Sequence, residues 1–366
     1  MTSATDLIAA GEAGDRSVFP VTLRDPVAPE APPRQYEVVA RSDADGSPAG
    51  YRMTVQVNVC TDGLCRMVNV TLYWDALGYY ERLKCPPETP LTRKEHDPFT
   101  PDDYRKLDRI LENRESILGR LAYTALVEQQ PEQAEEGEQV DGWSGATPQT
   151  VADSVVEGAA FTTWTLWHWV NGEIVSHLRD STVERATPQF VRRLLRSEHQ
   201  REVGFALRNL LNSERPDERL VDDVLHAMEN TRHAVYVSLA LDYLVAAIDD
   251  ERRLHDRLIG SFRRLDDHTS RPILDYFSGR AELPPKTLEG LSGVLEHLPY
   301  FQVHRILLLL EEREGSAEVE ANVARLLGHE NFFIARRAYE HLRKQDLGDG
   351  TARQLAAFRE RYADRL

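Results

Sequence analysis

The residues best suited to chemistry lie in one short run, Asp141-Gly-Trp-Ser-Gly-Ala-Thr147. Gly145 lets the backbone approach a phosphate closely, and Ala146 leaves the surroundings unobstructed. The hydroxyl of Ser144 and nearby backbone N–H groups can hold phosphate oxygens, as can a helix that begins at Thr147-Pro148. The residue types and their order therefore favour the binding of a phosphate group on a loop.

A purely structural interpretation of the same run stays open. Asp141-Gly142 and Ser144-Gly145 could form turns, while Thr147 caps a helix whose first residue is Pro148. Capping explains the Thr-Pro pair well. It explains the aspartate six residues before the threonine and the Gly-Ala pair only poorly.

The run resembles the attachment motif of the FMN-binding domain family, known from the covalent-flavin subunits of sodium-pumping NADH:quinone oxidoreductases. That motif reads Asp, two variable residues, Ser or Thr, Gly, Ala and Thr, and it is matched by Asp141, Ser144, Gly145, Ala146 and Thr147. The resemblance implies that FMN is attached to Thr147 through a phosphoester. It also implies a dedicated flavin transferase, which uses FAD and magnesium, as a maturation partner.

The residues around the motif extend the resemblance to about residues 37–185. The run Cys60-Thr-Asp-Gly-Leu-Cys65 and the stretch 91–104 look like the segments before this motif in other bacterial flavin-domain proteins. Trp143, at a variable position, is included among the predicted cofactor-binding residues. The aromatic group at 161–169 could stack on the flavin, although a core element is the alternative.

The histidines and the rest of the chain offer few other sites. We expect His168 to be a hydrogen-bonded core or rim residue and His96 to be a turn residue. Histidines pair nowhere at i, i+4, which argues against zinc. The sequence contains neither a glycine-rich phosphate loop nor a G-x-S-x-G or H-E-x-x-H motif. Ordinary kinase and hydrolase functions are therefore not indicated.

The cysteines bear on the compartment. Cys60 and Cys65 flank Asp62-Gly63, a strong hairpin signal that could bring the two thiols within disulfide range. Buried free thiols and a metal site are the alternatives. A disulfide would indicate an oxidising compartment, yet residues 1–14 lack the features of a signal peptide. We therefore expect a periplasmic or otherwise extracytoplasmic protein whose leader is absent from this sequence, with a cytoplasmic protein as the alternative.

The composition limits the class of partner. The chain has 366 residues, enough for two or more domains, and a net charge of −16. An acidic balance argues against nucleic acid as the main partner, because phosphate contacts need clustered Lys and Arg. The sequence contains no run of 18 apolar residues, so we expect no transmembrane segment.

The elements that must position the motif fall into three parts. The proline-dense residues 1–36 predict a flexible segment. Alternation at 36–40, 51–59 and 67–73 predicts a small antiparallel sheet, and Thr100-Pro101 begins a predicted helix. From about residue 187 apolar residues recur at three and four, which predicts short helices only.

The expected fold class is therefore α+β: a small antiparallel-sheet domain at 37–185, followed by an all-α, HEAT-like helical repeat at 186–366. A compact helical bundle is the alternative for the second part. The function expected from the resemblance is an electron-transfer flavoprotein that carries FMN and docks a redox partner through its helices. A cofactor-free helical scaffold that binds other proteins is the alternative.

Overall fold

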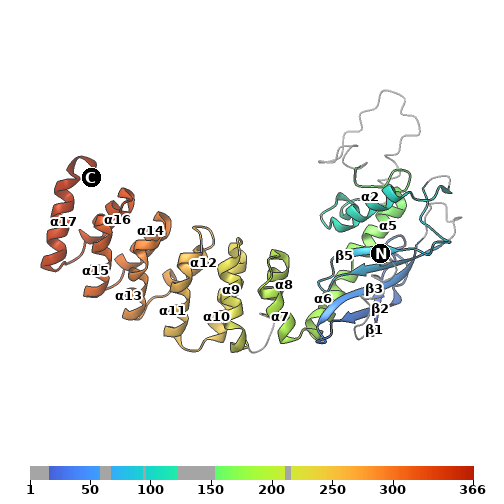
Figure 1. Cartoon of the computed structure of the whole chain (residues 1–366), viewed down its shortest axis with the longest axis horizontal. Coiled ribbons are helices and arrows are strands. Elements are labelled where there is room, and N and C mark those ends of the chain that lie inside the picture. Colours follow the sequence, from blue (N-terminus) through green and yellow to red (C-terminus); the bar gives the residue numbers. More distant parts are fainter. Residues whose placement is uncertain (1–15, 58–66, 94–95, 123–152, 211–215) are drawn as a thin grey trace, which may run out of the picture. The chain divides into compact units, whose positions relative to one another are not determined.

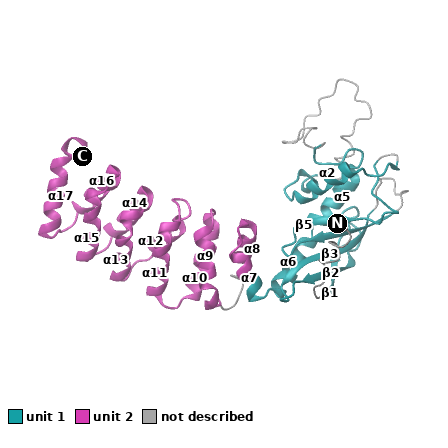
Figure 2. Ribbon diagram, viewed as in Figure 1, with its two compact units in different colours: residues 1–190 teal, residues 191–366 magenta. Residues whose placement is uncertain are grey.

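A computed structural model describes residues 16–57, 67–93, 96–122, 153–210 and 216–366. The chain divides into two compact units, residues 1–190 and residues 191–366 (Figure 2). The first unit contains an antiparallel sheet and helices, and the second unit contains helices in its described part. The expected α+β fold class with an all-helical C-terminal region is confirmed.

The sheet of the first unit is a five-stranded meander with the strand order β1-β2-β3-β4-β5 (Figure 1). Its strands are β1 (Arg16–Leu23), β2 (Arg34–Ser42), β3 (Pro48–Val57), β4 (Val68–Trp74) and β5 (Tyr80–Lys84). Every neighbouring pair is antiparallel. Strands β2, β3 and β4 agree with the alternation in the sequence.

Strand β1 corrects the expectation of a flexible segment over the whole of residues 1–36. Residues 16–23 pair with β2 along their full length. Val21 and Leu23 are buried in the core, and this burial offsets the conformational entropy that is lost when the strand is ordered. Pro20 is tolerated because β1 lies at the edge of the sheet, where a missing N–H breaks no second ladder. The proline-dense residues 26–33 form the connection to β2.

Three helices cover the inner face of the sheet: α2 (Pro101–Glu112), α5 (Ala160–Asn171) and α6 (Ile174–Arg185). Helix α2 begins with the expected cap, in which the backbone N–H of Asp103 donates to Thr100 Oγ1 at 3.3 Å. The core joins distant segments. Trp74 Nε1 donates to the carbonyl oxygen of Val170 at 2.9 Å, and the hydroxyls of Tyr51 and Thr182 lie 2.6 Å apart.

The helical region runs from α7, which crosses the boundary between the units, to α17. Its α-helices are α7 (Pro188–Leu195), α8 (Gln200–Leu210), α9 (Val221–Asn230), α10 (Ala234–Ala247), α11 (Glu251–Ser261), α12 (Arg271–Ser278), α13 (Pro285–Gly293), α14 (Tyr300–Glu311), α15 (Ala317–Arg325), α16 (Phe332–Leu342) and α17 (Asp349–Arg361).

These helices form two stacked layers. Helices α8, α10, α12, α14 and α16 contact one another in succession, and α11, α13, α15 and α17 do the same in the second layer. Polar contacts recur between residues about one helix pair apart, such as Asn322 Nδ2 to Ser292 Oγ at 3.0 Å. Contacts between successive pairs are the pattern of helical repeats. Whether the repeats are of the HEAT kind stays a prediction.

Candidate functional site

The predicted attachment motif lies outside the described residues. This holds for Asp141, Trp143, Ser144, Gly145, Ala146 and Thr147, and also for Cys60 and Cys65. The predicted flavin attachment and the predicted disulfide therefore stay predictions. What the structure describes is the framework on either side of the motif.

Helix α5 holds both described ends of the chain around the motif. Before the motif, the carbonyl oxygen of Leu121 accepts a hydrogen bond from Trp164 Nε1 at 2.8 Å. After it, the backbone N–H of Val156 donates to Thr163 Oγ1 at 3.2 Å. Trp164 and Thr163 are adjacent residues of α5 and both are buried. The two ends are thus fixed to one rigid element.

A polar pocket of about 350 Å³ opens beside the second of these ends. Lys106, Arg109 and Asn113 contribute to it from α2 and its C-terminus, and Asp153 and Ser154 contribute from the segment before α5. Lys106 and Arg109 are three residues apart on α2 and so share a helical face. In the sequence, only the i, i+3 spacing of these two cations indicates that they act together.

The aromatic group at 161–169 forms part of the core. Trp164, Trp167 and Trp169 are all less than 9% exposed. Trp167 Nε1 donates to the carbonyl oxygen of Asn113 at 2.9 Å, which ties α5 to the end of α2. The alternative of a core element is therefore confirmed. A flavin could stack on these rings only by displacing core side chains. We therefore no longer expect this aromatic group to bind the flavin ring.

His168 also has a structural role. Its Nε2 lies 3.1 Å from the carbonyl oxygen of Leu118, and its ring lies 4.2 Å from that of Trp164. Burial lowers the pKa of His168 below its ordinary value, which favours the neutral imidazole. His96 has a φ of 65°, as expected for a turn residue.

The third cysteine, Cys85, is a partly buried free thiol at the end of β5. Burial raises the pKa of this thiol to about 11. A thiol with so high a pKa carries little thiolate at neutral pH and is a poor nucleophile. Cys85 is therefore not a candidate catalytic residue.

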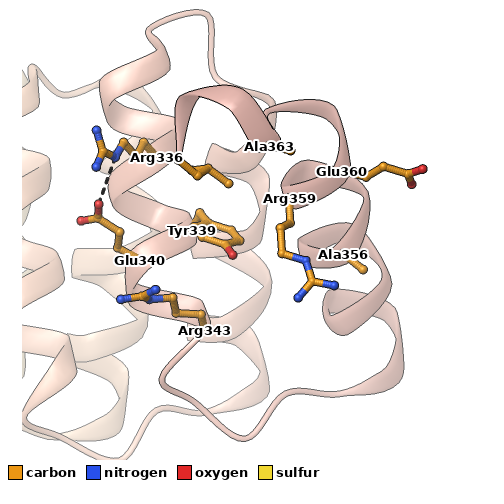
Figure 3. A pocket seen from close by; sticks show the side chains of 9 residues that line it. Arg336, Tyr339, Glu340, Arg343, Ala356, Arg359, Glu360 and Ala363 are labelled. Atoms are coloured by element: carbon orange, nitrogen blue, oxygen red, sulfur yellow. Dashed lines mark hydrogen bonds and ion pairs between the residues drawn. The ribbon is translucent and has the colours of Figure 1, made fainter.

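A second pocket lies in the helical unit, between α16 and α17. This groove has a volume of about 740 Å³ and is lined by Arg336, Arg343, Arg359 and Tyr339 among others. Figure 3 shows Tyr339 between the two helices and Arg336 paired with Glu340, whose atoms lie 3.1 Å apart. The ring of Tyr339 stacks on that of Phe358 at 5.5 Å. The groove is polar and open, and the carboxylates of Glu340 and Glu360 line it together with the guanidinium groups.

In comparisons with known proteins, no family model, curated protein or solved structure matches the chain. Within the described residues, no group of His, Cys, Asp and Glu side chains is arranged to hold a metal ion. None of the described helices is long and apolar enough to cross a membrane.

Proposed function

We propose that this protein is an electron-transfer flavoprotein that carries FMN on Thr147. The observation that carries the proposal is the five-residue match at Asp141, Ser144, Gly145, Ala146 and Thr147. A bound flavin would supply redox chemistry that amino-acid side chains lack. The helical unit would dock the redox partner. An extracytoplasmic location belongs to the same proposal.

The polar pocket beside α2 supports the proposal. Asp153, which lines the pocket, is six positions after Thr147 in the sequence, and a chain of that length spans at most about 20 Å. Lys106 and Arg109 therefore lie within reach of a phosphate esterified to Thr147. Their positive charges suit a phosphodiester, and Asn113 and Ser154 offer further polar groups. The two cations of the pocket outnumber its one carboxylate, Asp153, and this balance suits the phosphate end of FMN.

The attachment step follows from the family resemblance. The Thr147 hydroxyl oxygen would form a bond to the phosphorus of the FMN half of FAD, AMP would leave, and the hydroxyl proton would pass to solvent or to the transferase. Asp141 would orient the hydroxyl or the magnesium ion. No net oxidation or reduction occurs in this step, so the flavin transferase is the only protein partner it needs.

The test is co-expression with an active flavin transferase, followed by denaturing gel electrophoresis under ultraviolet light. We expect flavin fluorescence that survives denaturation, and an intact mass raised by one FMN less one water. Thr147→Ala should abolish both signals. The matched control is Thr150→Ala, since Thr150 is the nearest rival acceptor and should be dispensable. Flavin fluorescence in the Thr147→Ala variant would show that Thr147 is not the attachment site. A wild-type chain without fluorescence, beside a reference protein that is labelled, would overturn the proposed function.

A cofactor-free scaffold that binds other proteins is the second candidate. The layered helices of the second unit favour it, because stacked repeats present extended surfaces to partners. The co-expression experiment separates the two candidates, since a scaffold would take up no covalent flavin.

A further inference from the structure

The outer face of the sheet carries a row of cations around one tyrosine. Residues directly opposite each other in neighbouring antiparallel strands point to the same face. One such row is Val18, Val39, Arg52, Tyr73 and Arg82. Lys84, opposite Thr71, lies two residues further along β5 on the same face. The core cluster contains none of these six side chains.

The cations of this row, Arg52, Arg82 and Lys84, have no carboxylate partner among the described residues. The guanidinium carbon of Arg82 lies 4.2 Å from the centroid of the Tyr73 ring, and Lys84 Nζ lies 5.7 Å from it. Tyr73 therefore orders two positive charges side by side while they remain open to solvent.

We propose that this face, defined by Arg52, Tyr73, Arg82 and Lys84, docks the acidic surface of a protein partner. The whole chain has a net charge of −16, so three cations without an ion pair among the described residues stand out against their surroundings. Such a patch attracts an acidic partner and fixes its orientation, while the remaining negative charge disfavours other approaches. Arginine is also among the residues most enriched at binding hot spots.

Single-stranded nucleic acid is disfavoured as the occupant. Sheet faces that bind it offer exposed aromatic rings on which bases stack. Tyr73 is only 7% exposed, and Arg82 covers its ring. In the described strands no other aromatic side chain shares this face, because Phe19, Tyr36 and Tyr51 belong to the inner side. A carboxylate, in contrast, can pair with Arg52 or Arg82 without a stacking platform.

The experiment uses the full chain and a fluorescent peptide of twelve glutamates. We expect an anisotropy increase at about 50 mM salt that is lost at 500 mM, as screening requires. The double variant Arg52→Glu/Arg82→Glu should weaken binding at least tenfold. The matched control, Arg232→Glu/Arg252→Glu, changes the net charge equally in the helical unit and should bind within twofold of the wild type.

A second readout does not depend on any variant. Carbodiimide activates the peptide carboxylates and couples them to a nearby amine with loss of water, and Lys84 is the lysine on this face. Mass spectrometry should therefore find the cross-link at Lys84. Equal binding by both double variants, or cross-links only at other lysines, would overturn the proposal. Tighter binding of a twelve-nucleotide oligothymidine than of the peptide would overturn it in favour of nucleic acid.

Discussion

At the scale of single residues, the hairpin between β2 and β3 shows how the backbone depends on glycine. Gly50 has a φ of 150°, and a Cβ atom there would lie 2.4 Å from the Arg41 guanidinium and 2.6 Å from the carbonyl oxygen of Trp74. Arg41 crosses this glycine to reach Glu81 at 3.2 Å. The absence of a side chain at Gly50 thus allows both the strand conformation and the ion pair.

We therefore predict that Gly50→Ala destabilises the first unit by at least about 2 kcal/mol, from backbone strain and the clash with a carbonyl oxygen. Urea denaturation monitored by tryptophan fluorescence measures this loss. Gly46→Ala is the control: Gly46 has a φ of 79°, but a Cβ there would meet nothing within 4 Å. The control should lose only the strain, about 1 kcal/mol. Equal losses in the two variants would contradict the clash.

At the scale of elements, the sequence predicts the strands and helices in which buried residues recur at the regular period of that structure. Strands β3 and β4 alternate clearly, and α9, α15 and α16 carry apolar stripes. Helices α12 and α17 are among those that the sequence pattern does not reveal. Helix α12 has eight residues and α17 buries only Phe358, so neither repeats an apolar position often enough to stand out. Strand β1 is not predicted, because the burial of its residues depends on pairing with a strand that the local sequence does not reveal.

The site was less predictable than the fold. A motif can be recognised from Asp141 to Thr147 because its residues are contiguous. The pocket beside α2, in contrast, brings Arg109 together with Ser154, which lies 45 residues later in the chain. The use of Trp164 and Trp167 as core residues also depends on carbonyl oxygens of a distant segment. Pairings of this kind follow only from the tertiary structure.

Helix packing in the second unit gives a pH prediction. His255 of α11 is fully buried, with Nδ1 2.9 Å from Thr287 Oγ1 of α13 and Nε2 3.3 Å from the hydroxyl of Tyr276. Burial lowers its pKa below the ordinary value of 6.5, against the opposing charge of Glu251. The folded state therefore binds a proton less readily than the unfolded state does.

The sign follows from linkage. The stabilisation is complete above about pH 6.5 and is lost as the pH falls through the lowered pKa of folded His255, because the unfolded state takes up the proton first. We predict that the unfolding free energy of the helical unit falls between pH 7 and pH 5, and falls less in His255→Gln. The slope contributed by one group is at most about 1.4 kcal/mol per pH unit. Urea titrations at both pH values measure it, and an unchanged slope in the variant would exclude His255 as its source.

At the scale of the whole molecule, the division into two compact units predicts that the helical part folds alone. Its helices contact their neighbours in the stack, so their apolar stripes need no sheet to cover them. A fragment of residues 187–366, which keeps α7 intact, should be soluble and strongly helical and should bind no flavin. Circular dichroism and a cooperative thermal transition are the checks, and an unfolded fragment would contradict the prediction.

Scattering from the same fragment tests the layered arrangement. A compact bundle of about 180 residues would have a radius of gyration near 16 Å. Stacked pairs that contact only their neighbours make a longer body, so we expect a clearly larger value. A measured radius near 16 Å would favour the bundle instead.

The hydrogen bonds from Trp74 to Val170 and between Tyr51 and Thr182 have a consequence for synthesis on the ribosome. They join residues 96 and 131 positions apart, so the sheet cannot bury its inner face until α5 and α6 have emerged. Until then Val38, Met53 and Leu72, all buried in the finished unit, face water or a chaperone. The helical unit closes its contacts locally and can fold as each pair appears. The first unit is thus synthesised first, yet its sheet completes its core only after α5 and α6 have been synthesised.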